Sequence, residues 1–366
     1  MKKVTIRDIA REANVSIATV SRVINHEDLV DDETKRRVLE AMEKHEYSPS
    51  LAARNLSKQA SNAIGVIIPE IDNPFYGKIL RTLTNMATSE GMSVVCYDTN
   101  NDPQRDLESL RLMREHRVCG LLYAPSVEYG SGDAVSDAKQ ALDLLNIPVV
   151  LIDREVPELG RPGVYLDNFG AGYLCAKILA AAGHRRIAIV TGGNLIGISK
   201  ERLRGYTTAL DSEGIEVDDR YVVAGDFTAE TAYRLGKELL EMEERPTAVI
   251  TSNNMTTLGM MQAVNELGIG VPDEVDLFGI DSIDAFDAIN MSYNHVTRSR
   301  ADMARSAMEM LLTAVRADSD DVPELETVIY APGFVLNEML LQAAGKSGLL
   351  DQQTTEKNRK EGSQDE

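Results

Sequence analysis

The sequence has three cysteines, no apolar run approaching the roughly 20 residues of a membrane span, and no apolar segment behind its N-terminal lysines. Cys96, Cys119 and Cys175 lie far apart, which excludes paired-cysteine metal and redox motifs. Isolated cysteines suit a reducing compartment. We therefore expect a soluble, cytoplasmic protein without a membrane segment.

Sequence motifs of the common enzyme classes are also missing. There is no nucleophile elbow and no HExxH zinc motif. The run Gly192-Gly193-Asn194-Leu195-Ile196-Gly197 follows an expected strand, but it lacks both the GxGxxG order and the Gly-Lys-Ser/Thr ending of phosphate-binding loops. We therefore predict that the chain is not an enzyme and needs no metal or cofactor.

The charges are distributed unevenly along the 366 residues, a length that predicts two or three domains. Residues 1–60 hold 11 Lys/Arg and 10 Asp/Glu, a balance of +1. The remainder holds 27 Lys/Arg and 48 Asp/Glu, a balance of −21, which accounts for the net charge of −20. This asymmetry indicates a DNA-reading head on an acidic body.

Three short helices are predicted within residues 5–45. Thr5 precedes the first with Asp8 three residues on, Ser16 precedes the second, and Asp31 or Asp32 begins the third. We expect a small core between them, with Val38, Leu39 and Met42 of the third helix facing inward. The core residues expected from the first two helices and their turn are Ile9, Val15, Val20 and Val23.

The second of these helices has the side chains of a major-groove reader. Hydroxyl groups can bind phosphates, Arg22 can make a bidentate contact with guanine, and the apolar Ile17 and Ala18 can contact thymine methyl groups. The hydroxyl-bearing residues of this face are Ser16, Thr19 and Ser21. The same pattern would fit a three-helix bundle with an ordinary polar face.

A short helix is predicted after Tyr47-Ser48-Pro49, where Ser50 precedes Leu51-Ala52-Ala53-Arg54-Asn55-Leu56. A helix of this length is marginal in water, so it requires a partner. Small Ala53 allows close approach to the DNA backbone, and Leu56 can enter between base steps in the minor groove.

Four segments of the chain resemble the lactose/galactose repressor family (LacI/GalR). They are Val4-Thr5-Ile6-Arg7-Asp8-Ile9-Ala10, Val15-Ser16-Ile17-Ala18-Thr19-Val20-Ser21-Arg22-Val23-Ile24-Asn25, Tyr47-Ser48-Pro49 and the Ala-Arg-x-Leu segment. The resemblance extends to about residue 340. It implies a homodimer on pseudo-palindromic operator DNA, with Leu56 of each chain at a central step. It also implies further DNA contacts from Thr5, Asn25, Thr34, Tyr47 and Ser50. Asp31 departs from the family, whose members tend to carry neutral or basic residues there.

From residue 63 onward, short apolar runs alternate with amphipathic segments such as 79–88 and 104–115. The expected strands are 64–68, 93–97, 118–123, 149–152, 187–191, 248–252 and 276–280. Such alternation predicts doubly wound parallel sheets. The resemblance implies two lobes, like those of periplasmic binding proteins, with chain crossings near residues 161–164, 292–296 and 330.

Polar and aromatic residues follow several of these strands, where ligands of parallel sheets bind. Each alone would fit a strand-end cap, but together they predict a pocket for a hydroxylated ligand. The resemblance implies the effector contacts Asp153, Arg202, Phe227, Asn253 and Asp281, with Phe75 and Tyr76 at the mouth.

Some positions depart from the family pattern within this body. Ile196 and Ile198 replace the polar contacts of purine-binding relatives, which argues against a purine, and Asn254 stands where many relatives have Asp. The segment Asn294-His295-Val296-Thr297-Arg298 replaces the commoner Leu-Thr-Thr run, and we expect His295 to be structural rather than part of the pocket.

We therefore expect a helix-turn-helix domain over residues 1–48, a hinge over 49–62, a two-lobed core over 63–341 and a disordered tail over 342–366. Leu349-Leu350 cannot supply a heptad seam, so a dimer is expected, with the helix near residues 76–88 contributing to its surface. The expected function is a repressor controlled by a sugar or sugar derivative. A nucleoside or a protein corepressor is the alternative, and a secreted sugar-binding protein would not explain the head.

Overall fold

The computed structural model describes residues 5–25, 30–45, 62–126, 132–193, 197–289, 291–317 and 324–349. The chain divides into two compact units, residues 1–62 and residues 63–366. The first unit is helical, and the second contains two six-stranded sheets.

Each described helix of the first unit has, at its start or in its first turn, a side chain that accepts a hydrogen bond from a backbone N–H. Ahead of α1 (Ile6–Glu12), the Asp8 carboxylate accepts from the backbone N–H of Thr5 at 2.9 Å. Ser16 Oγ accepts from the N–H of Thr19 at 3.0 Å at the start of α2 (Ile17–Asn25). Asp31 accepts from the N–H of Thr34 at 2.9 Å at the start of α3 (Asp32–Lys44).

The core of this unit is small and apolar. Ile9, Val20, Val23 and Val38 are at most 1% exposed, and Val15 and Met42 pack at its edge. The prediction that Leu39 faces inward is wrong, because Leu39 is 43% exposed. Val38 and Ala41 already occupy the inner face of α3, and one residue along a helix turns the side chain by about 100°.

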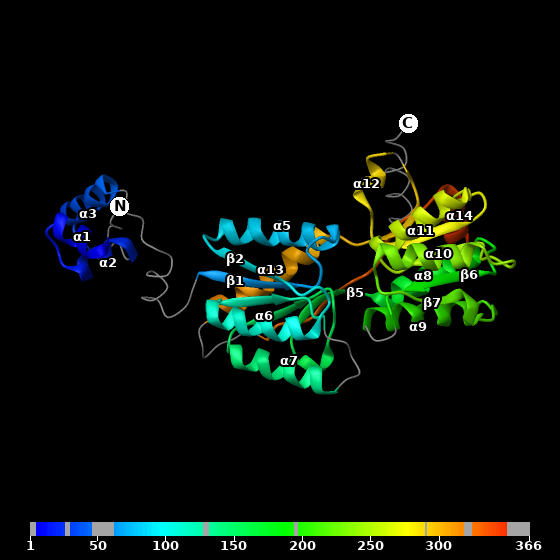
Figure 1. Ribbon diagram of the computed structural model, residues 1–366, viewed down its shortest axis with the longest axis horizontal. Helices are drawn as coiled ribbons and strands as arrows, with labels where there is room; N and C mark the ends of the chain where they lie inside the picture. Colours follow the sequence, from blue (N-terminus) through cyan, green and yellow to red (C-terminus); the bar gives the residue numbers. More distant parts are fainter. Residues whose placement is uncertain are drawn as a thin grey trace. The chain divides into compact units, whose positions relative to one another are not determined.

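The first sheet belongs to one lobe and is parallel throughout. Its strands, in spatial order, are β11 (Val328–Tyr330), β5 (Gly163–Leu166), β4 (Val149–Ile152), β3 (Gly120–Tyr123), β1 (Ala63–Ile68) and β2 (Ser93–Asp98). Figure 1 shows α5 (Pro74–Ser89) and α13 (Arg300–Arg316) on one face, with α6 (Pro103–His116) and α7 (Gly132–Leu145) on the other. A short 3-10 turn, η2 (Pro157–Leu159), precedes β5.

The second sheet repeats this arrangement and ends in one antiparallel strand. Its spatial order is β12 (Gly333–Val335), β10 (Asn294–Thr297), β9 (Asp276–Ile280), β8 (Ala248–Thr251), β6 (Ile187–Thr191) and β7 (Val222–Ala224). On one face lie α8 (Asn168–Ala181), α9 (Gly197–Ser212) and α14 (Glu338–Lys346). On the other lie α10 (Ala229–Leu240) and α11 (Asn254–Leu267), and η3 (Asp219–Tyr221) and α12 (Asp284–Asp287) complete the lobe.

The predicted two-lobed fold of doubly wound sheets is confirmed, but two of the expected crossings are misplaced. Residues 163–166 and 294–297 are strands that complete their sheets before the chain changes lobe. The first crossing therefore lies at Asp167 and the second at Arg298-Ser299. The third falls between β11 and β12, close to the expected residue 330.

The core also extends beyond its expected end at residue 341. The helix α14 continues to Lys346, and Leu340 and Ala344 are fully buried against the second sheet. The expected disordered tail beginning at residue 342 is therefore wrong for residues 342–346. Leu340 and Ala344 are four residues apart, so both lie on the same face of α14.

Two glycines allow α8 and α9 to pack with their backbones in contact. A Cβ atom at Gly172 would lie 2.1 Å from the carbonyl oxygen of Arg202, and one at Gly205 would lie 2.2 Å from the carbonyl oxygen of Phe169. Such a distance is below any van der Waals contact. Glycine at these positions therefore fixes how closely Arg202 approaches the rest of the second lobe.

We predict that Gly172→Ala lowers the free energy of unfolding by about 1–3 kcal/mol, because the added methyl group forces the two helices apart. Gly345→Ala is the matched control, since a Cβ at this helical position meets no atom within 4 Å. The control is expected to be neutral or slightly stabilising. Urea unfolding of the two variants would contradict the account if both changed stability equally.

Candidate functional site

A narrow cavity lies among residues contributed by both lobes, with about 30 Å³ of room for a water-sized molecule. This volume is far below the roughly 300–1,000 Å³ of ligand sites, so binding of a ligand would require the lobes to move apart. All seven residues expected to contact an effector line it: Phe75, Tyr76, Asp153, Arg202, Phe227, Asn253 and Asp281. Further lining residues are Glu70, Asn73, Arg154, Ile198, Asn254 and Arg298.

Three of the lining residues have strained backbones. Asp153, Phe227 and Asp281 adopt φ angles of 69°, 69° and 78°, a left-handed conformation that costs about 1–3 kcal/mol for residues other than glycine. Asp153 and Asp281 directly follow β4 and β9. Strain at the ends of strands from both sheets, all facing one cavity, indicates a ligand site.

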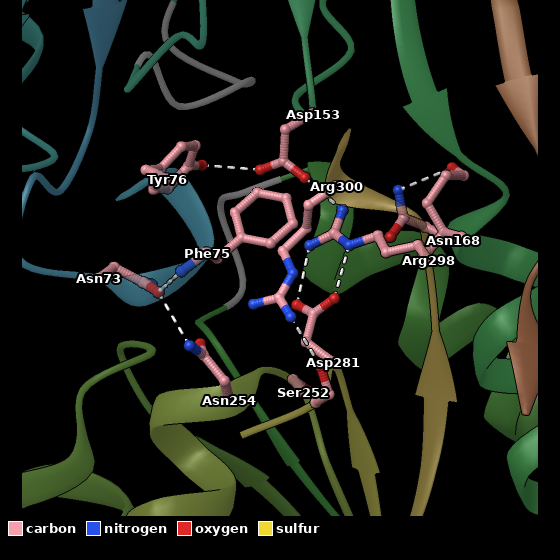
Figure 2. A network of polar contacts seen from close by, with 12 residues as sticks. Asn73, Phe75, Tyr76, Asp153, Asn168, Ser252, Asn254, Asp281, Arg298 and Arg300 are labelled. Carbon is pink, nitrogen blue, oxygen red and sulfur yellow. Dashed lines mark hydrogen bonds and ion pairs between the residues drawn. The ribbon is translucent and has the colours of Figure 1, made fainter. Parts of the chain in front are cut away.

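Arg298 joins the two lobes inside this cavity, as Figure 2 shows. Its Nε donates to Asp281 Oδ1 at 2.6 Å and its Nη2 donates to Asp281 Oδ2 at 2.9 Å, a bidentate pair. Its Nη1 donates to Asp153 Oδ1 in the other lobe. The guanidinium also lies 3.9 Å from the centre of the Phe75 ring, a cation–π contact.

Burial and charge act in opposite directions on the acids of this cluster. Burial alone would raise the pKa of Asp281, but the charge and hydrogen bonds of Arg298 lower it below its usual value. Tyr76 donates its hydroxyl to Asp153 Oδ2 at 2.7 Å. Burial and the neighbouring Asp153 carboxylate raise the pKa of Tyr76 well above its usual value, so its proton is retained.

Arg202 is held from the α9 side with part of its donor capacity unused. Its Nε donates to Asn168 Oδ1 at 2.9 Å, and its Nη1 donates to the carbonyl oxygen of Ser252. Its Nη2 is buried without a hydrogen-bond partner. Burial and the nearby Arg298 charge lower the pKa of Arg202 to about 10.

Further polar contacts connect the lobes around the cavity. Asn254 Nδ2 donates to Asn73 Oδ1 at 2.9 Å, and Figure 2 shows this pair reaching across from α11. Lys78 of α5 donates to Asp284 of α12 at 2.7 Å. A ligand that entered between these residues would change how the lobes are held.

The glycine run near residue 192 has a packing role in the second lobe. A Cβ at Gly192 would lie 2.1 Å from the ring of Phe227, so glycine makes room for that aromatic side chain. Gly192 therefore allows Phe227 to form part of the cavity wall. This role needs neither a phosphate group nor catalytic chemistry.

Sequence reasoning missed Arg298 as a site residue, although a basic residue directly after an expected lobe crossing was a usable signal. It placed His295 outside the pocket, where the structure also has it. The imidazole Nδ1 of His295 lies 3.0 Å from the carbonyl oxygen of Tyr293, and the two rings stack at 4.7 Å.

The first unit presents a mixed surface on α2. Ile17 is 45% exposed, and Ala18 and Arg22 are exposed beside it. Ser16 and Thr19 are hydrogen-bonded to each other at 2.8 Å, and Ser21 is half-buried. Thr5 is exposed, and Thr34 accepts from Arg37 at 3.2 Å. Ile17, Ala18 and Arg22 are thus the most available for contacts.

Several predicted DNA contacts cannot be placed. Tyr47, Ser50, Ala53 and Leu56 lie outside the described residues, and Asn25 is described only as the last residue of α2. Within the described ranges, no helix is long and apolar enough to cross a membrane. Nor do His, Cys, Asp and Glu gather there in a group of three that could hold a metal.

Two family models match the chain. The model for bacterial regulatory proteins of the lacI family matches residues 5–50. The model for periplasmic binding proteins and the sugar binding domain of the LacI family matches residues 61–323. Together they match part of the first structural unit and most of the second.

Individual relatives extend this likeness over most of the chain. Catabolite control protein A of Priestia megaterium is 30% identical over 319 residues, 87% of this chain and 94% of that protein. The structure of the lac repressor dimer bound to operator and the anti-inducer ONPF covers 93% of this chain and 99% of its own, with 22% identity and a TM-score of 0.79. The complex of the regulator CelR with cellobiose covers 92% and 100%, with 24% identity and a TM-score of 0.66.

We predict that Arg298→Gln lowers the free energy of unfolding by about 3–5 kcal/mol at neutral pH, because it leaves buried carboxylates without their cation. In the native chain, Asp281 has a lowered pKa, so its contribution is present at neutral pH and is lost on acidification. In Arg298→Gln, we expect burial to raise the pKa of Asp281. Protonation of Asp281 on acidification then removes the free-energy penalty of an unpaired buried carboxylate.

The stability difference between the two proteins should therefore narrow from about pH 7.5 to about pH 5. Arg305→Gln is the control, because Arg305 pairs with Asp302 on the exposed face of α13, where an ion pair contributes about 0–1 kcal/mol. Denaturant unfolding of the native protein and of the two variants at several pH values gives the stability difference for each variant. A gap for Arg298→Gln that is independent of pH would contradict the proposed electrostatic role.

Proposed function

The chain belongs to the LacI family of bacterial regulatory proteins and is a DNA-binding transcription regulator, and we propose that it is a homodimeric repressor controlled by a small hydroxylated effector. The proposed effector site is the cavity between the lobes. The observation that carries the proposal is the convergence of strained, polar and aromatic strand-end residues on that cavity.

The lining chemistry favours a sugar or sugar derivative. Phe75 and Phe227 offer apolar faces, while Asn253, Asn254 and the guanidinium groups offer directed hydrogen bonds. Ile198 also lines the cavity, where a purine base would need polar contacts. The relative CelR, whose structure holds cellobiose, has the same fold.

The mechanism is a linked equilibrium between lobe arrangements. The lobe arrangement seen in the structure is stabilised by Arg298, by the Asn73–Asn254 pair and by the Lys78–Asp284 pair. An effector that binds one arrangement more tightly shifts the equilibrium toward it. A coupling of about 1–3 kcal/mol, equivalent to about 5–150-fold in affinity, is typical.

On the DNA side, α2 is the proposed recognition helix. Arg22 and Ile17 contact base edges in the major groove, and the hinge containing Leu56 lies in the minor groove at the centre of the site. Two copies, joined in part through α5, would match the symmetry of a pseudo-palindromic operator. Both the hinge placement and the dimer are proposals.

We predict that Arg22→Ala weakens binding to an operator selected from random duplex DNA by about 1–3 kcal/mol, because it removes a base contact. Arg36→Ala is the matched control, because Arg36 of α3 pairs with Glu40 at 2.8 Å on an exposed face. Fluorescence anisotropy with labelled operator measures both. Equal losses in the two variants would show a general charge effect instead of readout by α2.

We predict that Arg202→Ala abolishes the effect of effector on operator binding while operator affinity is retained. Arg202 lines the cavity and belongs to the second unit, so its removal leaves the DNA-binding head unchanged. Operator titrations with and without effector test this. A normal response to effector would remove Arg202 from the site.

A further inference from the structure

The acids that line the cavity have their oxygens occupied by internal donors. Asp281 accepts twice from Arg298, and Asp153 accepts from Arg298 and Tyr76. Glu70 accepts from Asn73 and from Asn101. The hydroxyl groups of a neutral sugar donate hydrogen bonds as well as accept them, and each of these carboxylate oxygens already accepts one hydrogen bond.

Two buried groups at this site have no hydrogen-bond partner, and one of them can only donate. Arg202 is 2% exposed, yet its Nη2 has no hydrogen-bond partner. The hydroxyl of Ser252, whose carbonyl oxygen accepts from Arg202, is also buried without a partner. A buried donor without a partner is unfavourable, so a group that supplies acceptors here would be favoured.

The charge around Arg202 favours an anion as that group. Arg202 and Arg298 line the same cavity, and the positive charge of Arg298 disfavours the charged form of Arg202. Arg298 is the ion-pair partner of both Asp153 and Asp281. Arg202 therefore has no ion-pair partner among the described residues. An anion bound beside Arg202 would relieve this repulsion and accept its unused hydrogen bonds.

We propose that the effector is an acidic sugar, a polyhydroxylated molecule whose carboxylate binds Arg202 with help from Arg298. This inference rests on the proposed function, since it names the effector class for the same cavity. It makes Arg298 a specificity-determining residue, because its charge selects the acid over the neutral sugar.

A carboxylate fits the charge balance better than a phosphate. The lining acids Glu70, Asp153 and Asp281 are matched by three arginines, Arg154, Arg202 and Arg298. A carboxylate adds one negative charge, which the unpaired Arg202 can match, whereas a phosphate ester adds about 1.5 to 2. In a buried site, the second uncompensated charge is strongly unfavourable.

Calorimetric titration of the full-length chain with matched sugar pairs tests the proposal. The pairs are galacturonate with galactose, glucuronate with glucose, and gluconate with glucitol, and glucose 6-phosphate serves as the phosphate probe. We expect at least one acid to bind at least tenfold more tightly than its neutral partner and than the phosphate. Binding by no acid, or tighter binding by a neutral sugar or by the phosphate, would overturn the proposal.

Arg298→Gln should weaken binding of the preferred acid at least tenfold more than binding of its neutral partner, because only the acid loses a charged contact with the ligand. Arg305→Gln should change neither affinity. Equal weakening of acid and neutral sugar by Arg298→Gln would overturn the specificity role. If Arg298→Gln does not fold, the native protein's affinity for the acid relative to the neutral sugar of each pair decides whether the proposal holds.

The same titrations, repeated with operator DNA, separate this inference from the proposed function. An acid that binds in the expected order without changing operator affinity would support the ligand class and contradict effector control. A neutral sugar that changes operator affinity and binds more tightly than its acid would support effector control and overturn the ligand class.

Discussion

The ion pairs of Arg298 with Asp153 and Asp281 are the constraint on which the second unit depends. A guanidinium and two carboxylates that are each about 95% buried are tolerated only when they satisfy one another. Asp153 follows a strand of one lobe and Asp281 follows a strand of the other, so pairing both with one cation links the lobes. The ion pairs that hold the lobes together therefore also set the electrostatics of the ligand site.

The topology explains why these charges meet. In both sheets the strand order reverses beside the first strand of the lobe, β1 or β6, and polar side chains follow the carboxyl ends of the neighbouring strands. Two such sheets, with their carboxyl ends on one cavity, bring loops from distant parts of the chain together. The left-handed backbone at Asp153, Phe227 and Asp281 then directs those side chains inward.

Hydrophobic runs predicted the doubly wound sheets and strand-end polarity predicted a pocket, whereas the two lobes and the seven cavity residues were implied by the family resemblance. The strands at 163–166 and 294–297 were missed as strands because each ends directly at a lobe crossing, where its polar neighbours resemble a linker. Arg298 was missed because its role depends on two aspartates 145 and 17 residues away. Leu39 was misassigned because periodicity alone does not say which apolar residue of a helix turn faces the core.

The central claim is that the lobe cavity and the DNA-binding head are energetically coupled. Thermodynamic linkage requires that DNA and effector change each other's affinity by the same factor. The most direct measurement is the dissociation constant of the effector, with and without saturating operator DNA. The account predicts that the two constants differ by about 5–150-fold. Equal constants, for a ligand that binds the cavity and an operator that binds the head, would contradict it.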